Sequence, residues 1–303
     1  MKKKIVITAA NGFLGEALVK HFVKKYEVVA LVRHECEFVK GVHYVKWDGK
    51  SLGPWQKTFE GAEAIINLAG KSVNCRYNET NKEAILRSRI ESTEVIGQAI
   101  DLCANPPKVW MNSASATIYQ HSEFQPMTES DGVLGDGFSV DVCKAWEKCF
   151  FDYSIRGVRQ VALRTAIVLD SKRGAFPVLK KVVRMGFGGK QGSGGQQFSW
   201  IHIQDFCRAV EFIMKDHQIE GAINLSAPFP VTNHYFQQNL RKRLGMRIAL
   251  NLPEWMLRFG AFFMGTETEL VLKSRYVVPD RLLRKRFRFK FARIELALRQ
   301  LVA

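Results

Sequence analysis

Short apolar stretches alternate, along the first half of the chain, with longer stretches in which apolar residues recur every three or four positions. The first pattern is typical of buried strands and the second of amphipathic helices. Strands that alternate with helices form a parallel sheet with helices on both faces. We therefore expect an α/β fold, with strands at 4–10, 27–33, 42–48, 62–70, 108–117 and 159–169, and with helices at 16–25, 81–104 and 143–153.

The pattern changes after residue 169. Residues 186–197, GFGGKQGSGGQQ, contain six glycines and predict a loop that contacts a ligand or moves as a lid. Residues 199–214 predict a strand that continues into a helix, and 221–228 predict another strand. We therefore expect a large lobe and a small lobe, the large one formed by 1–169 with 198–226 and the small one by 170–197 with 227–303.

Composition restricts the class of protein. The 303 residues are 47% hydrophobic and 24% charged, which is typical of a globular chain. No apolar run reaches the roughly 18 to 20 residues of a membrane span. Six cysteines are scattered without a C-x-x-C pair, and no histidine stands at metal-ligand spacing. We expect neither a disulfide framework nor a metal site, and a cytoplasmic location.

The net charge of +16 predicts an affinity for anions. In the most basic segment, 281–293, three phenylalanines at 287, 289 and 291 alternate with Arg288 and Lys290. Period two places rings and cations on opposite faces, so we expect a strand that covers a core. No helix-turn-helix, RRM or zinc-finger pattern accompanies the segment, so a nucleic-acid or membrane-surface binder is the last of the alternatives and no nucleic-acid partner is expected.

The stretch ITAANGFLGEAL joins the first strand to the first helix. Gly12 and Gly15 repeat the second half of a G-x-x-G-x-x-G pattern, and Ala9 replaces its first glycine. Glycines here let backbone N–H groups at a helix N-terminus approach a diphosphate, because no Cβ obstructs them. We expect Ala9 to fit if its φ stays negative. The stretch predicts a dinucleotide site at Ala10, Asn11, Gly12, Phe13, Leu14 and Gly15.

The second strand ends in LVRHE, which bears on the choice of dinucleotide. An acidic residue at this position binds the 2′-hydroxyl of NAD, whereas arginine accommodates the 2′-phosphate of NADP. Arg33, with His34 beside it, therefore favours NADP(H). Glu35 follows closely and keeps NAD as an alternative.

Several motifs resemble one known family. TAANGFLG, INLAG, SASATIY, LRTAIVL and SWIHIQD occur in the order and spacing of extended short-chain dehydrogenases/reductases. RYNETNKEAILRSRIEST, KAWE, NLSAPFPVTN and ETELVLKSRYVVP resemble the atypical branch of epimerase-family (nucleoside-diphosphate-sugar epimerase-like) proteins, together with its C-terminal domain. The resemblance covers nearly the whole chain. It implies a Rossmann-type doubly wound parallel sheet that binds NADP(H), with a smaller C-terminal α/β lobe closing over a cleft.

The resemblance also implies roles for single residues. INLAG places Asn67, Leu68, Ala69 and Gly70 against the cofactor. Asp48, at the end of the third strand, matches the residue that touches the adenine, and Arg89 on the long helix meets a phosphate. Ser115 matches the serine or threonine that polarises the substrate oxygen in active relatives, although a strand-end serine without a catalytic role is an equal alternative.

The family's Tyr-x-x-x-Lys pair is missing. Counted back from Glu147, its register falls on Ser139 and Cys143, and Lys144 stands one residue off, about 100° around the helix. Relatives use the tyrosine to transfer a proton and the lysine to lower its pKa. Three explanations stay open. In the first, another group replaces the pair, namely Ser115, Tyr119, Cys143 or Lys144. In the second, the reaction needs weaker acid–base catalysis. In the third, the protein binds NADP(H) without turning it over.

We expect an NADP(H)-dependent oxidoreductase or epimerase-like enzyme. Ser115 would hold a carbonyl oxygen of a small-molecule substrate, and nucleotide-linked compounds are among the candidates. The alternative is a catalytically silent NADP(H)-binding regulatory or sensor protein. The sequence predicts neither the substrate nor the oligomeric state.

Overall fold

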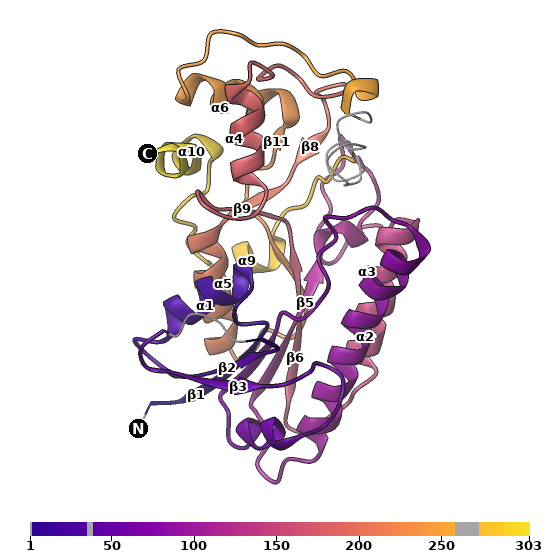
Figure 1. The fold of residues 1–303 in the computed structure, drawn as a ribbon, viewed down its shortest axis with the longest axis vertical. Helices are drawn as coiled ribbons and strands as arrows, with labels where there is room; N and C mark the ends of the chain where they lie inside the picture. The colour runs from indigo at the N-terminus through magenta and orange to yellow at the C-terminus, as the bar shows by residue number, and fades with distance from the viewer. Residues whose placement is uncertain (1, 35–38, 258–272) are drawn as a thin grey trace.

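A seven-stranded parallel sheet forms the centre of the molecule. The computed structural model describes residues 2–34, 39–257 and 273–303. Neighbouring strands in the order β10-β6-β5-β4-β1-β2-β3 all run parallel (Figure 1). The strands are β1 (Lys4–Thr8), β2 (Glu27–Val32), β3 (Val42–Lys46), β4 (Ala64–Asn67), β5 (Val109–Ser115), β6 (Arg159–Thr165) and β10 (Gly221–Leu225).

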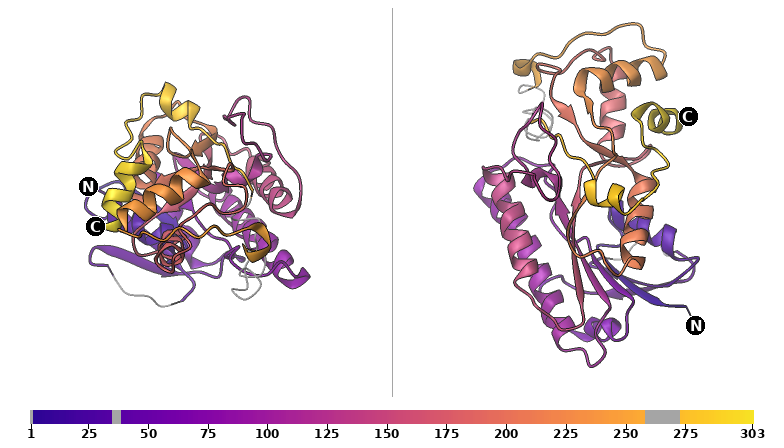
Figure 2. Two further views of the ribbon diagram at one scale, coloured as in Figure 1. Left: turned by 90° about the horizontal axis from the view of Figure 1, so that it is seen from above. Right: turned by 180° about the vertical axis from the view of Figure 1, so that it is seen from behind.

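Helices cover both faces of this sheet. One face packs against α1 (Phe13–Phe22) and α5 (Ile203–Lys215), and the other against α2 (Glu79–Asp101) and α3 (Phe138–Phe151) (Figure 2). Two short 3-10 helices, η1 (Pro54–Phe59) and η2 (Ala116–Ile118), complete this part of the chain. The arrangement confirms the expected Rossmann-type doubly wound α/β fold.

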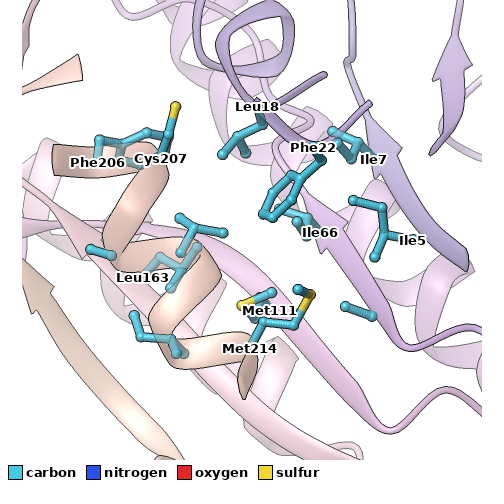
Figure 3. Close-up of a cluster of buried hydrophobic side chains, with 14 of the residues drawn as sticks. Ile5, Ile7, Leu18, Phe22, Ile66, Met111, Leu163, Phe206, Cys207 and Met214 are labelled. Carbon is cyan, nitrogen blue, oxygen red and sulfur yellow. The ribbon is translucent and has the colours of Figure 1, made fainter. Parts of the chain in front are cut away.

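Period-two burial along the strands explains why both faces hold an apolar core. Ile5 and Ile7 of β1 belong to the cluster under α1 and α5, whereas Val6 belongs to the cluster under α2 and α3. In Figure 3, Leu18 and Phe22 of α1 point toward the sheet in the first cluster. Phe22 is fully buried, and removing such a ring costs about 3–5 kcal/mol of stability.

The smaller lobe lies beyond one end of the sheet, at the top of Figure 1. Its own core contains Phe176, Val183, Phe236 and Leu298, all fully buried. Two-stranded sheets, β8 with β11 and β7 with β9, lie at its base. The elements are β7 (Ile167–Leu169), α4 (Phe176–Arg184), β8 (Gln197–Phe198), β9 (Trp200–His202), β11 (Val231–Thr232), α6 (Asn233–Arg243) and α10 (Ile294–Val302). The helix α9 (Asp280–Arg284) instead packs on β10, and its Leu282 belongs to the cluster under α1 and α5.

Two elements differ from the sequence prediction. The strand expected at 159–169 is divided between β6 and β7, which belong to different sheets. Residues 287–291 form no strand, although the expected facing is correct: Phe287 and Phe291 are buried, and Arg288 and Lys290 are exposed. The physical reason lies in Asp205. Its carboxylate accepts the backbone N–H groups of Lys290 and Phe291, which therefore take a side chain as partner in place of a neighbouring strand.

None of the described helices combines the length and the apolar character that a membrane span requires. The apolar stretch 255–265 falls largely outside the described residues.

Candidate functional site: a cleft at the carboxyl ends of the strands

The turn between β1 and α1 has no room for side chains. An ideal Cβ on Gly15 would lie 2.3 Å from the carbonyl oxygen of Ala9 and 2.7 Å from the Cα of Ala10. A Cβ on Gly12 would lie 3.1 Å from the same oxygen. Gly12 caps α1 without a side-chain hydrogen bond, so the first N–H groups of the helix are open to an anion. The turn therefore has the shape and the donors of a diphosphate cradle.

Ala9 departs from the expectation of a negative φ. Its φ is +48°, in the left-handed region that glycine adopts without strain. The N–H of Gly12 donates to the Ala9 carbonyl at 2.8 Å, which closes a β-turn over Ala10 and Asn11 directly after this residue. The chain thus keeps the backbone of the G-x-x-G-x-x-G turn while carrying a methyl group at its first position.

Asn67 organises the strand ends behind this turn. It is fully buried, and its Oδ1 accepts from the Thr8 hydroxyl at 2.7 Å and from the Ala69 N–H at 3.1 Å. Its Nδ2 donates to Oδ1 of Asn112 at 2.7 Å, and the N–H of Leu68 donates to the Thr8 hydroxyl. Asn67 therefore ties β1, β4 and β5 together from inside the sheet, which makes it a positioning residue.

Gly70 and Arg89 lie against each other at the edge of the cleft. A Cβ on Gly70 would be 3.4 Å from the guanidinium carbon of Arg89. Arg89 donates to the Ile85 carbonyl at 2.8 Å and lies 5.0 Å from the ring centre of Trp146. Burial lowers the pKa of Arg89, but arginine stays protonated at neutral pH. The sequence placed these two residues on different elements, and the structure brings them together.

A pocket of about 510 Å³ opens at the ends of β2 and β3. Asp48 lies in its wall, and Oδ1 accepts the N–H groups of Lys50 and Ser51 at 2.8 and 2.9 Å. These backbone hydrogen bonds lower the pKa of Asp48. The expected residues Arg33, His34 and Asp48 therefore share one pocket, which we name the β2–β3 pocket; it is lined by Arg33, His34, Lys46, Trp47, Asp48, Ser51, Leu52, Gly53 and Trp55.

Another pocket, of about 180 Å³, lies between the two lobes, and we name it the cleft pocket. The sheet side contributes the ends of β5 and β6, including Ser115, whose hydroxyl accepts the N–H of Thr117 at 3.2 Å. The other side carries side chains that the sequence did not single out. The lining residues are Ser115, Ala116, Thr117, Thr165, Ala166, Ile167, Gln196, Gln197, Phe198, Ser199, Asn233, Lys273 and Arg275.

The glycine-rich loop forms one wall of the cleft pocket, and buried amides fix it. The Asn233 side chain accepts from the N–H of Gln191 at 3.0 Å and donates to the Gln191 side chain at 3.2 Å. Nε2 of Gln196 donates to the Gln191 carbonyl at 2.8 Å. All three residues are at most 5% exposed. These bonds favour a rigid wall over a lid. In the sequence, only the run of glutamines beside the glycines indicated such a wall.

Tyr119 does not reach either pocket. It is 1% exposed, and its hydroxyl donates to Oδ1 of Asn224 at 2.9 Å and accepts from Arg164 at 2.8 Å. Arg164 also forms a two-pronged ion pair with Glu147. Burial raises the pKa of Tyr119, while Arg164 acts in the opposite direction. The hydroxyl is thus part of a core network, and we do not carry Tyr119 forward as an acid–base group.

The helix that would carry the Tyr-x-x-x-Lys pair offers no replacement at the matching positions. Cys143 is 6% exposed, and burial raises the pKa of its thiol to about 12 even though the guanidiniums of Arg89 and Arg275 act against this. A thiol with this pKa stays protonated at neutral pH. Lys144 donates to the Gly135 carbonyl at 2.7 Å, which holds its ammonium at a loop. Of the four groups considered, only Ser115 lines the cleft pocket.

His202 is held by three contacts in the interior of the protein. Its ring accepts the N–H of Gln204 at the start of α5, bonds Gln300 at 2.8 Å and stacks on Phe291 at 3.8 Å. Burial lowers the pKa of His202, so the ring is neutral. Among the described residues, no cluster of His, Cys, Asp and Glu has the arrangement of a metal site.

Comparisons with known proteins match both ends of the chain to family models. Residues 5–135 match the NAD-dependent epimerase/dehydratase family, and residues 252–301 match a domain of unknown function, DUF1731. An epimerase family protein of Staphylococcus aureus is 29% identical over 304 residues, which cover 99% of each chain.

Solved structures resemble the whole chain. The human epimerase family protein SDR39U1 (isoform 2) with NADPH has a TM-score of 0.87 and 29% identity, covering 99% of each chain. A nucleoside-diphosphate sugar epimerase from Corynebacterium glutamicum has a TM-score of 0.79 and 27% identity, covering 100% of this chain and 58% of that one. A UDP-N-acetylglucosamine 4-epimerase from Methanobrevibacter ruminantium, with a TM-score of 0.78 and 18% identity, shares the fold.

Proposed function

Because the chain belongs to the NAD-dependent epimerase/dehydratase family and carries the DUF1731 domain at its C-terminal end, we propose that it is an NADP(H)-binding oxidoreductase or epimerase-like enzyme. The observation that carries this proposal is the turn at 9–15, where a Cβ on Gly15 would overlap the backbone of Ala9 and Ala10. A cradle of this shape serves a diphosphate that backbone N–H groups approach directly.

The remaining cofactor residues fit this assignment. The N–H groups of Phe13, Leu14 and Gly15 would hold the diphosphate, and Arg89, beside Gly70, would face a phosphate or the nicotinamide ribose. Asp48 would accept the adenine amino group through Oδ2, since Oδ1 carries both backbone bonds. The human relative whose structure contains NADPH supports the same cofactor class.

The β2–β3 pocket supports NADP(H) over NAD(H). It contains Arg33, His34 and Lys46, and among the described residues Asp48 is the one acidic residue in its wall. A 2′-phosphate placed at the end of β2 would meet a guanidinium, with which it can form two charge-assisted hydrogen bonds. The carboxyl end of β2 carries no carboxylate among the described residues that could bind the 2′-hydroxyl of NAD, and Glu35 lies outside them.

The chemistry assigned to the cleft pocket is reduction or oxidation next to a polarised oxygen. NADPH, when bound, supplies a hydride, and the site must polarise the acceptor oxygen and let a proton reach it. The Ser115 hydroxyl can donate a hydrogen bond to that oxygen, because its own acceptor bond from Thr117 leaves the proton available. Cys143 and Lys144 are held elsewhere, so the proton would come from water, which suits an activated carbonyl or a conjugated double bond.

A catalytically silent NADP(H)-binding regulator is the second candidate. The observation in its favour is the helix α3, where Cys143 is buried and Lys144 bonds a loop carbonyl, so neither group performs the role of the family's acid–base pair. In this case the protein binds the reduced cofactor and a partner responds to the bound state.

Removing the Arg33 guanidinium tests the cofactor assignment. Arg33→Ala should weaken NADPH about 10- to 100-fold in titration calorimetry, the value expected for hydrogen bonds to a charged group, and should leave NADH nearly unchanged. Arg87→Ala is the matched control, because Arg87 is an exposed arginine paired with Glu83 and Glu91 on α2. Equal losses for the two nucleotides would contradict the 2′-phosphate site, and an absence of binding would contradict the proposed function.

A substrate panel distinguishes the enzyme from the regulator. Purified protein with NADPH is mixed with carbonyl, enone and nucleotide-sugar compounds, and the absorbance of NADPH is followed. Oxidation that Ser115→Ala slows, while NADPH affinity is retained, would support the enzyme. Tight NADPH binding without oxidation by any compound would favour the regulator.

A further inference from the structure

The cleft pocket has an unusual distribution of charge. Lys273 and Arg275 lie in its wall, and none of the described residues that line it is an aspartate or glutamate. The other polar groups of the wall are neutral, namely hydroxyls and amides such as Ser115, Gln196 and Asn233. A pocket that presents cations and neutral donors is complementary to an anion.

The charge of the chain is unevenly distributed between the segments of the two lobes. Divided at the proposed boundaries, the segments of the large lobe contain 24 Lys and Arg and 23 Asp and Glu, whereas those of the small lobe contain 21 and 6, a net charge of +15. Six of these 21 cations lie at 281–290, which packs on β10 and α5 of the large lobe, so the rest of the small lobe carries +9. Residues 171–197 and 227–253 contain ten Lys and Arg and not a single acidic residue. Cations on one side of a low-dielectric cleft focus a positive potential inside it.

The backbone around Arg275 is held firmly against the pocket wall. Its N–H donates to the Gln197 carbonyl at 3.0 Å, and its carbonyl accepts from the Ser199 hydroxyl. The preceding residue, Ser274, accepts the N–H of Gln197 at 2.8 Å and donates to the Ser122 carbonyl. A guanidinium on a segment fixed at both ends is preorganised, which reduces the entropy lost on binding.

The position of Arg275 relates it to the missing acid–base pair. Its charge acts on the Cys143 thiol, which stands where the family's lysine would be. The Arg89 guanidinium acts on the same thiol more strongly, so both guanidiniums contribute positive charge at this position. Ser115, the candidate for the substrate oxygen, lines the same pocket.

The size of the pocket limits the ligand. Its volume of about 180 Å³ corresponds to about six water molecules at about 30 Å³ each. This volume suits a small acid and is too small for a nucleoside diphosphate with an attached sugar, since pockets for larger ligands span about 300–1,000 Å³.

We propose that the cleft pocket binds a small substrate that carries a carboxylate or phosphate group, and that Arg275 and Lys273 hold this group while Ser115 faces the reacting oxygen. The assignment rests on the proposed function in one respect, namely that the bound anion is the compound reduced or oxidised. Anion binding itself does not depend on turnover, so the two can be tested separately.

The test compares anionic probes with neutral ones on the full chain saturated with NADPH. Binding of 2-oxobutyrate, its neutral amide, inorganic phosphate and UDP-glucose is measured by titration calorimetry. The wild-type protein should bind 2-oxobutyrate at least about ten-fold more tightly than the amide, as expected when a charged group loses its partner. Phosphate should compete with 2-oxobutyrate. Tighter binding of phosphate than of the oxo acid would identify a phosphate ester as the substrate source, and the reverse would identify a carboxylic acid.

Three variants assign the effect to the pocket. Arg275→Gln should abolish the preference for the anion, and Lys273→Gln should weaken binding several-fold, while both retain their affinity for NADPH. Arg243→Gln is the control, because it removes one charge from an exposed position of the small lobe outside the pocket. Its binding should match the wild type within about two-fold, which is the scale of a screened distant charge.

Each contrary outcome has a separate meaning. Equal binding of 2-oxobutyrate and its amide, or equal losses in Arg275→Gln and Arg243→Gln, would overturn the anion site. UDP-glucose that binds more tightly than the small acids and depends on Arg275 would overturn the size argument. Anion binding in a protein that fails to bind NADPH would leave the anion site standing and remove the proposed function.

Discussion

The two lobes of this chain differ in how they handle charge. The large lobe contains almost equal numbers of cations and anions and pairs many of them internally, as Glu63 does with Lys3 and Lys108. The small lobe carries +9 without the segment 281–290, which packs on the large lobe, and it has long stretches without an acidic residue. A balanced, internally paired lobe is stabilised by its charges. A lobe whose charges are mostly positive is destabilised by their mutual repulsion, and an anionic ligand would reduce this repulsion.

The lobes also fix their functional surfaces by different means. In the large lobe, the backbone at Gly12 and Gly15 forms the cradle, and the glycines are required because nothing larger fits. In the small lobe, side-chain amides from Gln191, Gln196 and Asn233 hold the glycine-rich loop in place. The difference predicts that damage to each lobe affects one ligand and spares the other.

A crossed pair of glycine substitutions should have the largest effect. Gly15→Ala should reduce NADPH affinity at least about 100-fold and stability by about 2–3 kcal/mol, because the new Cβ meets backbone atoms at 2.3 and 2.7 Å. Gly189→Ala, in the small lobe, meets the Asn251 side chain at 2.4 Å and the Leu250 carbonyl at 2.7 Å. It should weaken binding of the small anion and leave NADPH affinity within about three-fold of wild type.

The two ligands are measured on both variants by calorimetry, and thermal unfolding reports the loss of stability. Gly12→Ala provides a graded control in the same turn, because its Cβ would meet one atom at 3.1 Å and should cost less than Gly15→Ala. A loss of both ligands in both variants would show that the lobes do not act separately, and the comparison would fail.

The two lobes also differ in how much of their structure could be predicted from the sequence. The large lobe was predictable, because period-two burial in β1 and the glycine spacing are local patterns with one structural meaning. The cleft wall was not, since Arg275 and Asn233 reach it from segments far apart in the chain, and the family motifs that contain them do not indicate that the two segments meet. The core position of Tyr119 was also hidden, because its partners Arg164 and Asn224 are 45 and 105 residues away.

The pairing of charges in the large lobe predicts a dependence of its stability on pH. Burial opposes ionisation of Glu211, but hydrogen bonds from Lys215, Lys25 and His21 outweigh it and lower the pKa of Glu211 to about 2. A carboxyl whose pKa is lower in the folded state adds stability above its unfolded pKa. That stability decreases as the pH falls from 4.5, the pKa of an unperturbed glutamate, toward about 2.

Glu211→Gln should therefore destabilise the protein at neutral pH by about 1–2 kcal/mol, a value reduced for the solvent exposure of the lysines. The difference from wild type in urea unfolding should shrink as the pH is lowered through this window. Glu79→Gln is the control, since that carboxylate is 89% exposed and pairs with Lys82 alone. A Glu211→Gln deficit that stays constant down to the lowest accessible pH would show that packing, and not the ion pairs between α1 and α5, causes it.

The smallest expected effects come from two residues with a strained backbone. Among the described residues, Ala9 before α1 and Arg286 after α9 are the non-glycine residues with positive φ, at +48° and +59°. A left-handed conformation costs a non-glycine residue about 1–2 kcal/mol of stability. Glycine avoids this cost, but its greater conformational freedom in the unfolded chain lowers the stability by about 0.4–1 kcal/mol. Ala9→Gly and Arg286→Gly should each stabilise the protein by about 0.5–1 kcal/mol, as the difference of these two terms.

The residues next to them, Ala10 and Phe287, belong to the same core cluster, so the double variant tests whether the two gains add. Ala10→Gly is the control for Ala9→Gly. Ala10 is buried and is not among the residues of positive φ, so its replacement should destabilise by about 1 kcal/mol. If Ala9→Gly also destabilised the protein, the methyl group of Ala9 would be contributing packing that outweighs the strain. The alanine at the head of the turn would then stabilise the cradle. The large lobe would depend on side-chain packing at this turn, whereas the comparison between the lobes attributes the shape of the turn to the backbone alone.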